Sequence, residues 1–183
     1  TMNKALQSAL EDRNIKAVVL RINSPGGSAL TSDLIWREVE KTAKEKPVVV
    51  SISDVAASGG YYIATPATYI FAQPTSITGS IGVFGTLPNA SELAEQWGVS
   101  SYTLSTHERS ATYSPLRPLS DSFRAELTEG IEQTYQTFLE RVASGRSMSI
   151  ESVDAIAQGR VYLAPKALEL GLVDEIGTLD DAL

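Results

Sequence analysis

The 183-residue chain contains no cysteine and a single histidine. The absence of cysteine excludes thiol nucleophiles, iron–sulfur clusters and cysteine zinc sites. Because His107 is the lone histidine, no site can use two histidine ligands, and a Ser-His mechanism would depend on this residue alone. A basic surface is also missing, since 22 acidic side chains outnumber 15 basic ones. This balance argues against a nucleic-acid-binding protein and against attraction to anionic lipid.

Long apolar runs are absent too. No stretch approaches the roughly eighteen consecutive apolar residues of a transmembrane helix, so we expect this chain to be soluble. Hydrophobic residues still make up 43% of the sequence, which is enough for one domain, residues 1–183, with a core that needs no disulfide or metal. The chain begins Thr-Met, which we interpret as the start of a fragment of a longer chain.

Two buried strands, each followed by a turn of small residues and a helix, predict an α/β fold. The β-branched runs at Lys16–Ile22 and Val48–Ile52 are typical of buried parallel strands. The first leads through a turn into a helix that we expect Ser32 to cap. The second leads through residues 56–60 into a helix at residues 61–64. Two such units with right-handed crossovers form a layered α/β core.

The remaining elements are predicted from shorter patterns. We expect further strands at residues 69–72, 81–84 and 101–104, a helix at residues 90–97, and a polar loop at residues 105–118. The second half is expected to be helical, at residues 121–145, 149–157, 164–170 and from residue 180. Ser120 and Asp121 are the candidate caps of the first of these helices, and Gly145 is its expected end.

Ser58 is the first candidate for chemistry. In an open α/β sheet, ligands bind beyond the carboxyl ends of the parallel strands, and Ser58 follows the second strand in the sequence A-A-S-G-G. Its hydroxyl would lie at a positive helix end, with the N–H of Gly59 directed at a developing oxyanion. This arrangement resembles a nucleophile elbow, although G-x-S-x-G is absent. The alternative is that Ser58 only caps the helix.

A second glycine turn, Asn23–Ser28, follows the first strand. It matches neither G-x-G-x-x-G nor a phosphate-binding loop, so nucleotide binding is disfavoured. One interpretation is a tight turn that lets a helix pack closely on the sheet. The other combines the two turns, because one would supply the nucleophile and an N–H while the other supplies the second N–H of an oxyanion hole.

Three blocks of sequence resemble, in order and spacing, the signatures of the signal peptide peptidase A family, also called protease IV. They are R-I-N-S-P-G-G-S (21–28), V-A-A-S-G-G-Y-Y-I-A (55–64) and T-G-S-I-G-V-F-G (78–85). Similar segments at 114–118, 156–162 and 167–177 extend the resemblance over nearly the whole chain. It implies a Clp-protease-like or crotonase-like spiral of βαβ units with a helical carboxy-terminal part.

The same resemblance implies a serine peptidase that uses a Ser-Lys dyad and no cofactor or metal. Ser58 falls on the family's nucleophile, and Gly27 and Gly59 fall on the positions whose N–H groups form the oxyanion hole. The implied substrates are released signal peptides and other membrane-associated peptides. The implied assembly is a homo-oligomer at the cytoplasmic membrane, with the catalytic domain on the outer side.

The sequence departs from the family pattern at the general base. Ser110 falls on the lysine position, in the segment H-E-R-S-A. No lysine lies between Pro47 and Pro165, and we expect those outside this interval to be solvated: Lys4, Lys16, Lys41, Lys44, Lys46 and Lys166. His107 has no carboxylate evidently placed to orient it, and the guanidinium of Arg109 does not deprotonate in proteins.

Long family members resemble two tandem copies, in which the amino-terminal copy supplies the lysine and the carboxy-terminal copy the serine. This chain therefore resembles the serine-bearing half, with its base supplied by a second copy of the fold. Two alternatives remain. A crotonase-type acyl-CoA enzyme would use the same two amides on a thioester, and an inactive copy would serve only as an assembly module.

Overall fold

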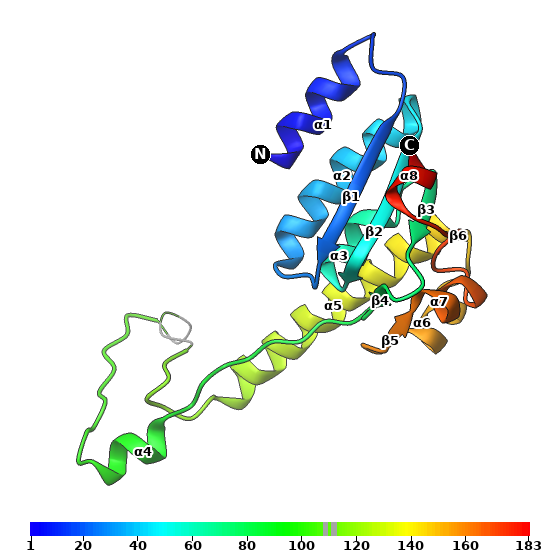
Figure 1. The fold of residues 1–183 in the computed structure, drawn as a ribbon. Coiled ribbons are helices and arrows are strands. Elements are labelled where there is room, and N and C mark those ends of the chain that lie inside the picture. The colour runs from blue at the N-terminus through cyan, green and yellow to red at the C-terminus, as the bar shows by residue number, and fades with distance from the viewer. Residues whose placement is uncertain (108–109, 111–112) are drawn as a thin grey trace. The chain divides into compact units, whose positions relative to one another are not determined.

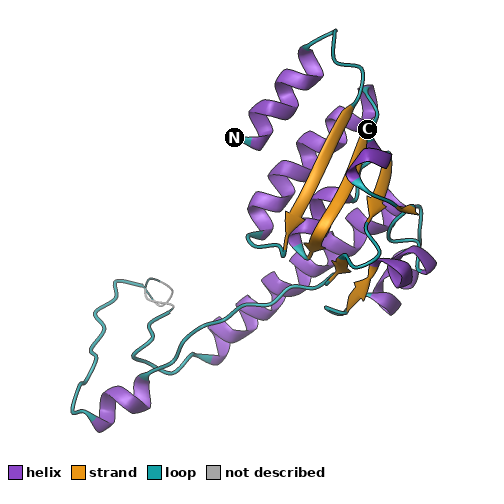
Figure 2. Ribbon diagram, in the orientation of Figure 1, coloured by secondary structure: helices purple, strands orange, loops and turns teal. Residues whose placement is uncertain are grey.

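The computed structural model describes residues 1–107, 110 and 113–183, and the chain divides into two units. The first unit comprises Thr1–Val83 and Thr134–Leu183, and the second comprises Phe84–Gln133. Figure 1 labels the helices and strands, and Figure 2 colours them by type.

The first unit holds most of the regular structure, and the long helix α5 (Asp121–Arg146) contributes residues to both units. Its amino-terminal elements are α1 (Met2–Glu11), β1 (Val18–Ser24), α2 (Ala29–Glu45), β2 (Val48–Ala57), α3 (Gly59–Ala64), β3 (Tyr69–Ala72) and β4 (Ile77–Gly79). Its carboxy-terminal elements are α6 (Ile150–Ile156), β5 (Val161–Leu163), α7 (Ala164–Glu169), β6 (Glu175–Ile176) and α8 (Leu179–Ala182). The second unit contains α4 (Ser91–Gln96).

Strand β2 is the centre of the sheet. One of its edges pairs in parallel with β1, and Val18 lies opposite Val48 in this pairing. Its other edge pairs first with β3 and then, nearer its carboxyl end, with β4, both in parallel. Strand β6 adds in parallel to β3, and β5 adds antiparallel to β4. This arrangement confirms the predicted α/β class.

The core forms where the β-branched run of β2 meets the helices. Val48, Val50 and Ile52, which share one face, are fully buried, and Ser51 on the other face is 2% exposed, so β2 is covered on both faces. Helices α2 and α3 pack together and lie behind the strands in Figure 1, while α8 lies in front and contacts β2 and β3. The turn after β1 leads into α2 and the turn after β2 leads into α3, so both helices lie on the same face of the sheet.

The cap of α2 differs from the prediction. Ser28, and not Ser32, accepts a hydrogen bond from the backbone N–H of Thr31 (3.3 Å), because the helix begins directly after the glycine turn. Ser32 lies one turn inside α2, where it is buried and its hydroxyl donates to the carbonyl of Ser28 (3.0 Å).

Two predicted strands are wrong. Residues 81–84 form no strand; the pairing strand is Ile77–Gly79, and Ile81 is instead buried with its carbonyl accepting from the Gly159 N–H (2.9 Å). Residues 101–104 form no strand because no described segment pairs with them, and Tyr102 and Leu104 are exposed.

Among the helices, α5 continues one residue beyond Gly145, the end expected from the sequence. The described structure also contains α1, β5 and β6, which the patterns did not predict. The predicted helices at residues 90–97, 149–157 and 164–170 are confirmed within a few residues.

The second unit lacks a hydrophobic core of its own. None of its described residues is buried. Its contacts are local, such as the Tyr113 hydroxyl donating to the carbonyl of Pro88 (2.7 Å). Large apolar side chains face solvent, including Phe84 (88% exposed) and Trp97 (76%). Across the described residues of both units, no helix is both long and apolar enough to cross a membrane.

Gly145 provides a test of the packing of α5. An ideal Cβ at this position would overlap the carbonyl oxygen of Thr65 and lie 2.7 Å from its carbonyl carbon. We expect Gly145→Ala to lower the free energy of unfolding by about 1–3 kcal/mol, the usual cost of overpacking. The measurement is urea denaturation followed by circular dichroism.

Gly130→Ala is the matched control on the same helix. A Cβ at Gly130 meets no described atom within 4 Å, so the helix propensity of alanine raises stability there by up to about 1 kcal/mol. Equal stability of the two variants would contradict the packing of α5 against Thr65.

Candidate active site

Ser58 lies between the end of β2 and the start of α3, as the sequence predicts. Its backbone has φ 51° and ψ −122°, a conformation that non-glycine residues rarely adopt. The turn is held from both sides, because the Ser58 N–H donates to the carbonyl of Gly79 at the end of β4 (2.9 Å) and its carbonyl accepts from the Tyr62 N–H (2.8 Å). Strained, over-determined residues of this kind cluster at functional sites.

The turn after β1 is organised by side chains of its own. The hydroxyl of Ser24 accepts a hydrogen bond from the Gly26 N–H (3.2 Å), which closes the turn. Asn23 ties it to β2, since its amide nitrogen donates to Asp54 (3.0 Å) and its amide oxygen accepts from the Val55 N–H (3.3 Å). These bonds lie where the β1–β2 register shifts. Sequence reasoning missed this role of Asn23, although the residue opens the predicted turn.

The two turns pack backbone against backbone. An ideal Cβ on Gly26 would lie 2.7 Å from the Gly59 nitrogen and 2.8 Å from the Ser58 Cβ. A Cβ on Gly59 would lie 3.3 Å from the Gly27 nitrogen and would overlap the Ser32 hydroxyl. The structure therefore brings together all three residues of the expected site, Ser58, Gly27 and Gly59.

Two backbone donors at this junction are unused. Neither the Gly27 N–H nor the Gly59 N–H has an acceptor among the described residues, and Gly59 begins α3, where helix geometry provides none. The N–H of Ser58 is not available, because it donates to Gly79. The Ser58 hydroxyl is half-buried and has no hydrogen-bond partner in the described part of the chain. Two unengaged amide donors thus lie close to an unengaged hydroxyl.

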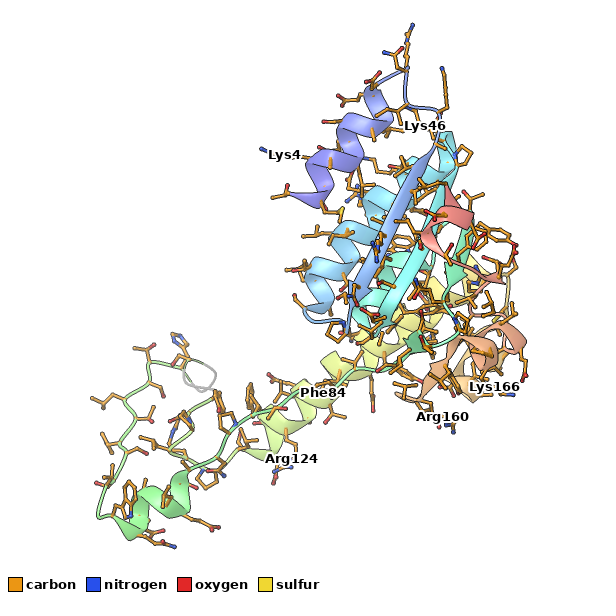
Figure 3. All side chains as sticks on the ribbon, viewed as in Figure 1. Lys4, Lys46, Phe84, Arg124, Arg160 and Lys166 are labelled. Carbon is orange, nitrogen blue, oxygen red and sulfur yellow. The ribbon has the colours of Figure 1, made fainter. Side chains whose placement is uncertain are left out.

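The lysines are engaged elsewhere or lie far along the chain from this junction. Lys41 and Lys166 pair with glutamates on their own helices at 3.4 and 2.7 Å. The Lys46 ammonium donates to the carbonyls of Ala9 and Asp12, so it anchors α1 and is not merely solvated. Figure 3 labels Lys46 at the end of α2 and Lys166 on α7. No lysine donates a hydrogen bond to the Ser58 hydroxyl, which has no partner among the described residues.

The expected lysine position and the alternative base His107 both belong to the second unit. Ser110, at the expected lysine position, is exposed and donates to the carbonyl of His107 (2.8 Å). The ring of His107 hydrogen-bonds to the hydroxyl of Thr106 (3.2 Å). Arg109 lies outside the described residues. No group of three His, Asp or Glu side chains among the described residues is placed to hold a metal ion.

Comparison with known proteins identifies the family to which the chain belongs. Residues 40–183 match the model of peptidase family S49, and the chain belongs to this family. Over its whole length the chain is 44% identical to "Protease 4" of Haemophilus influenzae, of which it covers 30%. Over 97% of its length it is 41% identical to "Serine protease SPPA, chloroplastic" of Arabidopsis thaliana, covering 26% of that relative.

A further relative is the "Putative signal peptide peptidase SppA" of Enterococcus faecium. The identity is 38% over 97% of the chain, which covers 52% of that protein. The chain therefore spans between about a quarter and a half of the length of these relatives. The match confirms the resemblance seen in the sequence blocks and, with it, the Clp-protease/crotonase-like superfamily of the fold.

Gly26→Ala tests the junction of the two turns. Gly26 has φ 105°, and its Cβ would collide with the Ser58 turn, so backbone strain and overpacking act together. We expect the free energy of unfolding to fall by about 3 kcal/mol, the sum of these two effects. Chemical denaturation measures the loss.

Gly171→Ala is the control that separates backbone strain from overpacking. Gly171 also has a positive φ (74°), but a Cβ there meets no described atom within 4 Å. The control should lose only about 1 kcal/mol, from backbone strain alone. If both variants lose the same amount, the close approach of the turns is not what requires glycine at position 26.

Proposed function

We propose that this chain is the serine-bearing catalytic domain of a membrane-associated serine peptidase whose lysine base comes from another copy of the fold. The observation that carries the proposal is the junction of the two turns. It presents the free Ser58 hydroxyl beside the two unused N–H groups of Gly27 and Gly59. Acyl transfer requires this combination of a nucleophile and paired oxyanion donors.

The proposed reaction proceeds through an acyl-enzyme. The Ser58 oxygen attacks the peptide carbonyl carbon while the neutral lysine amine removes the hydroxyl proton. The carbonyl electrons move to oxygen, where the Gly27 and Gly59 amides stabilise the negative charge. The carbon–nitrogen bond then breaks, and the lysine ammonium returns the proton to the leaving amine. Water repeats the attack on the ester and regenerates Ser58.

The need for an external base follows from the chemistry of serine. A hydroxyl is a weak nucleophile until a base accepts its proton, and no described residue of this chain forms a hydrogen bond with the Ser58 hydroxyl. The resemblance to tandem-copy members supplies a source, namely a lysine on a second copy that lies beside this one. We therefore propose that the isolated chain is inactive or weakly active.

We propose further that the copies associate through the exposed apolar side chains of the second unit, as parts of a homo-oligomer. Phe84, Trp97, Tyr102 and Leu104 are each at least 76% exposed, and their unit has no buried residue of its own among those described. Contiguous exposed apolar groups commonly mark association surfaces. The proposed occupant is the lysine-bearing copy of the same fold.

The proposed substrates are apolar peptides, with released signal peptides and other membrane-associated peptides as the class that the family resemblance suggests. The proposed location is the outer side of the cytoplasmic membrane. The names of the relatives support the peptidase part, since they include a signal peptide peptidase and two proteases.

A fluorophosphonate probe tests the function, because it labels only an activated serine. We expect Ser58 to react when the chain is part of the full-length protein with a lysine-bearing copy, and to react at least about a hundredfold more slowly when the chain is alone. Ser58→Ala should abolish labelling. Labelling is measured by gel fluorescence and by mass spectrometry of the modified peptide.

Ser149→Ala is the matched serine control, since Ser149 only caps α6 and should leave labelling unchanged. Failure of Ser58 to react in the full-length protein would reject the peptidase and favour an inactive assembly module. Turnover of an acyl-CoA thioester that survives Ser58→Ala would instead favour the crotonase-type enzyme.

A further inference from the structure

The spacing of the proposed oxyanion donors depends on how two helices are fixed to each other. Helix α2 begins directly after the Gly26–Gly27 turn, with Ser28 as its cap. Helix α3 begins directly after Ser58 and carries the Gly59 N–H. A shift of α2 along α3 would therefore change the distance between the two N–H groups. The side chains that lock these helices together are candidates for a role in the reaction.

One polar cluster joins these helices. The hydroxyl of Tyr62, on α3, donates to the Asp33 carboxylate, on α2, at 2.7 Å. Tyr62 lies one helical turn from the nucleophile, since its N–H donates to the Ser58 carbonyl. Asp33 lies in the second turn of α2, close behind the glycine turn. The Tyr62–Asp33 hydrogen bond thus links the two turns by a short path.

A third helix completes the cluster. Arg141, on α5, donates to the same oxygen of Asp33 at 3.4 Å, and its guanidinium carbon lies 3.7 Å from the centre of the Trp36 ring. Trp36 is on α2, and its indole N–H donates to the Thr65 hydroxyl at the end of α3 (3.0 Å). The ring of Tyr62 packs against Trp36 with edge-to-face geometry. Asp33 therefore has two donors, and α2 is tied to α3 at two levels.

The cluster is arranged for fixed geometry more than for stability. Tyr62 is 6% exposed, and burial together with the Asp33 hydrogen bond raises its pKa to about 12, so it remains a donor throughout the neutral range. The Arg141 Nε is buried and has no partner among the described residues, which costs stability. Replacing a buried ionic cluster with well-packed apolar side chains often leaves the stability unchanged. Apolar contacts, however, do not fix a single arrangement of the helices.

We propose that Tyr62, Asp33 and Arg141 are positioning residues that hold the Gly27 and Gly59 amides at the spacing the Ser58 oxyanion requires. They do not touch the reacting atoms; they act through the two helices. The inference rests on the proposed function of Ser58.

The test is Tyr62→Phe in the full-length peptidase, which removes one hydroxyl and keeps the ring. We expect kcat on an internally quenched apolar peptide to fall about tenfold to a hundredfold, the cost of a small misplacement of catalytic groups. KM should stay within about twofold, and fluorophosphonate labelling of Ser58 should slow by the same factor as kcat.

Tyr61→Phe is the matched control. Its hydroxyl is also buried but donates to the Leu172 carbonyl (2.8 Å), away from α2. It should lower the melting temperature and leave kcat and labelling unchanged. A fall in kcat that merely follows the melting temperature in both variants would overturn the positioning role.

Asp33 variants separate positioning from a general loss of packing. Asp33→Asn keeps an oxygen that accepts from Tyr62 and should retain kcat within about threefold. Asp33→Ala should lower kcat at least as much as Tyr62→Phe, because it also removes the acceptor of Arg141, and adding Tyr62→Phe to Asp33→Ala should lower kcat no further. Additive losses would contradict a single link.

Amide chemical shifts test the geometry without any peptidase activity. The Gly27 and Gly59 N–H resonances of the chain should shift in Tyr62→Phe and not in Tyr61→Phe. Unchanged resonances would overturn the inference even if Ser58 is the nucleophile. Shifted resonances together with an unreactive wild-type Ser58 would reject the proposed function and keep the structural link.

Discussion

The site depends on the contact between two backbone turns that approach more closely than any side chain would permit. A Cβ on Gly26 or Gly60 would collide with the opposite segment, and a Cβ on Gly59 would lie 3.3 Å from the Gly27 nitrogen. The parallel pairing of β1 with β2 brings the turns to the same edge of the sheet, and Asn23 bridges the last step of that pairing. Helix α2 and helix α3 then leave the junction on one face of the sheet. The nearness of the Gly27 and Gly59 amides to Ser58 follows from this contact, while hydrogen bonds to Gly79 and Tyr62 hold the Ser58 backbone.

The sequence was most informative where chemistry and folding impose the same residues. The β-branched run of β2 predicts a buried strand, and the two glycine turns predict a junction at its carboxyl end. Predictions failed where short segments depend on partners far along the chain. Residues 81–84 are as apolar as a strand, yet β2 pairs with Ile77–Gly79, and the carbonyl of Ile81 bonds to Gly159. Strands β5 and β6 are three and two residues long, too short for any periodicity to emerge.

Within the site, too, residues with a distinctive local sequence were predicted, and residues whose role depends on distant partners were not. Ser58, Gly27 and Gly59 were predicted from motif and resemblance, because each occupies a position with a distinctive local sequence. Asn23, Asp33 and Arg141 were not, since what they do depends on which helix or strand lies beside them. Arg141 is separated from Asp33 by more than a hundred residues, and only the fold brings them together. The general base is a third kind of case, because its expected absence from this chain rests only on the positions of the lysines along the sequence.

The backbone conformation of Ser58 has a consequence for how such domains change over time. A serine held at φ 51° is strained, and glycine at this position would relieve the strain while removing the nucleophile. The fold thus holds the proposed nucleophile in a backbone conformation that serine disfavours. Under the proposed function, a copy of the fold released from peptide cleavage would become more stable by exchanging this serine for glycine. Under the same proposal, folding stability favours loss of the serine and the requirement for activity opposes it.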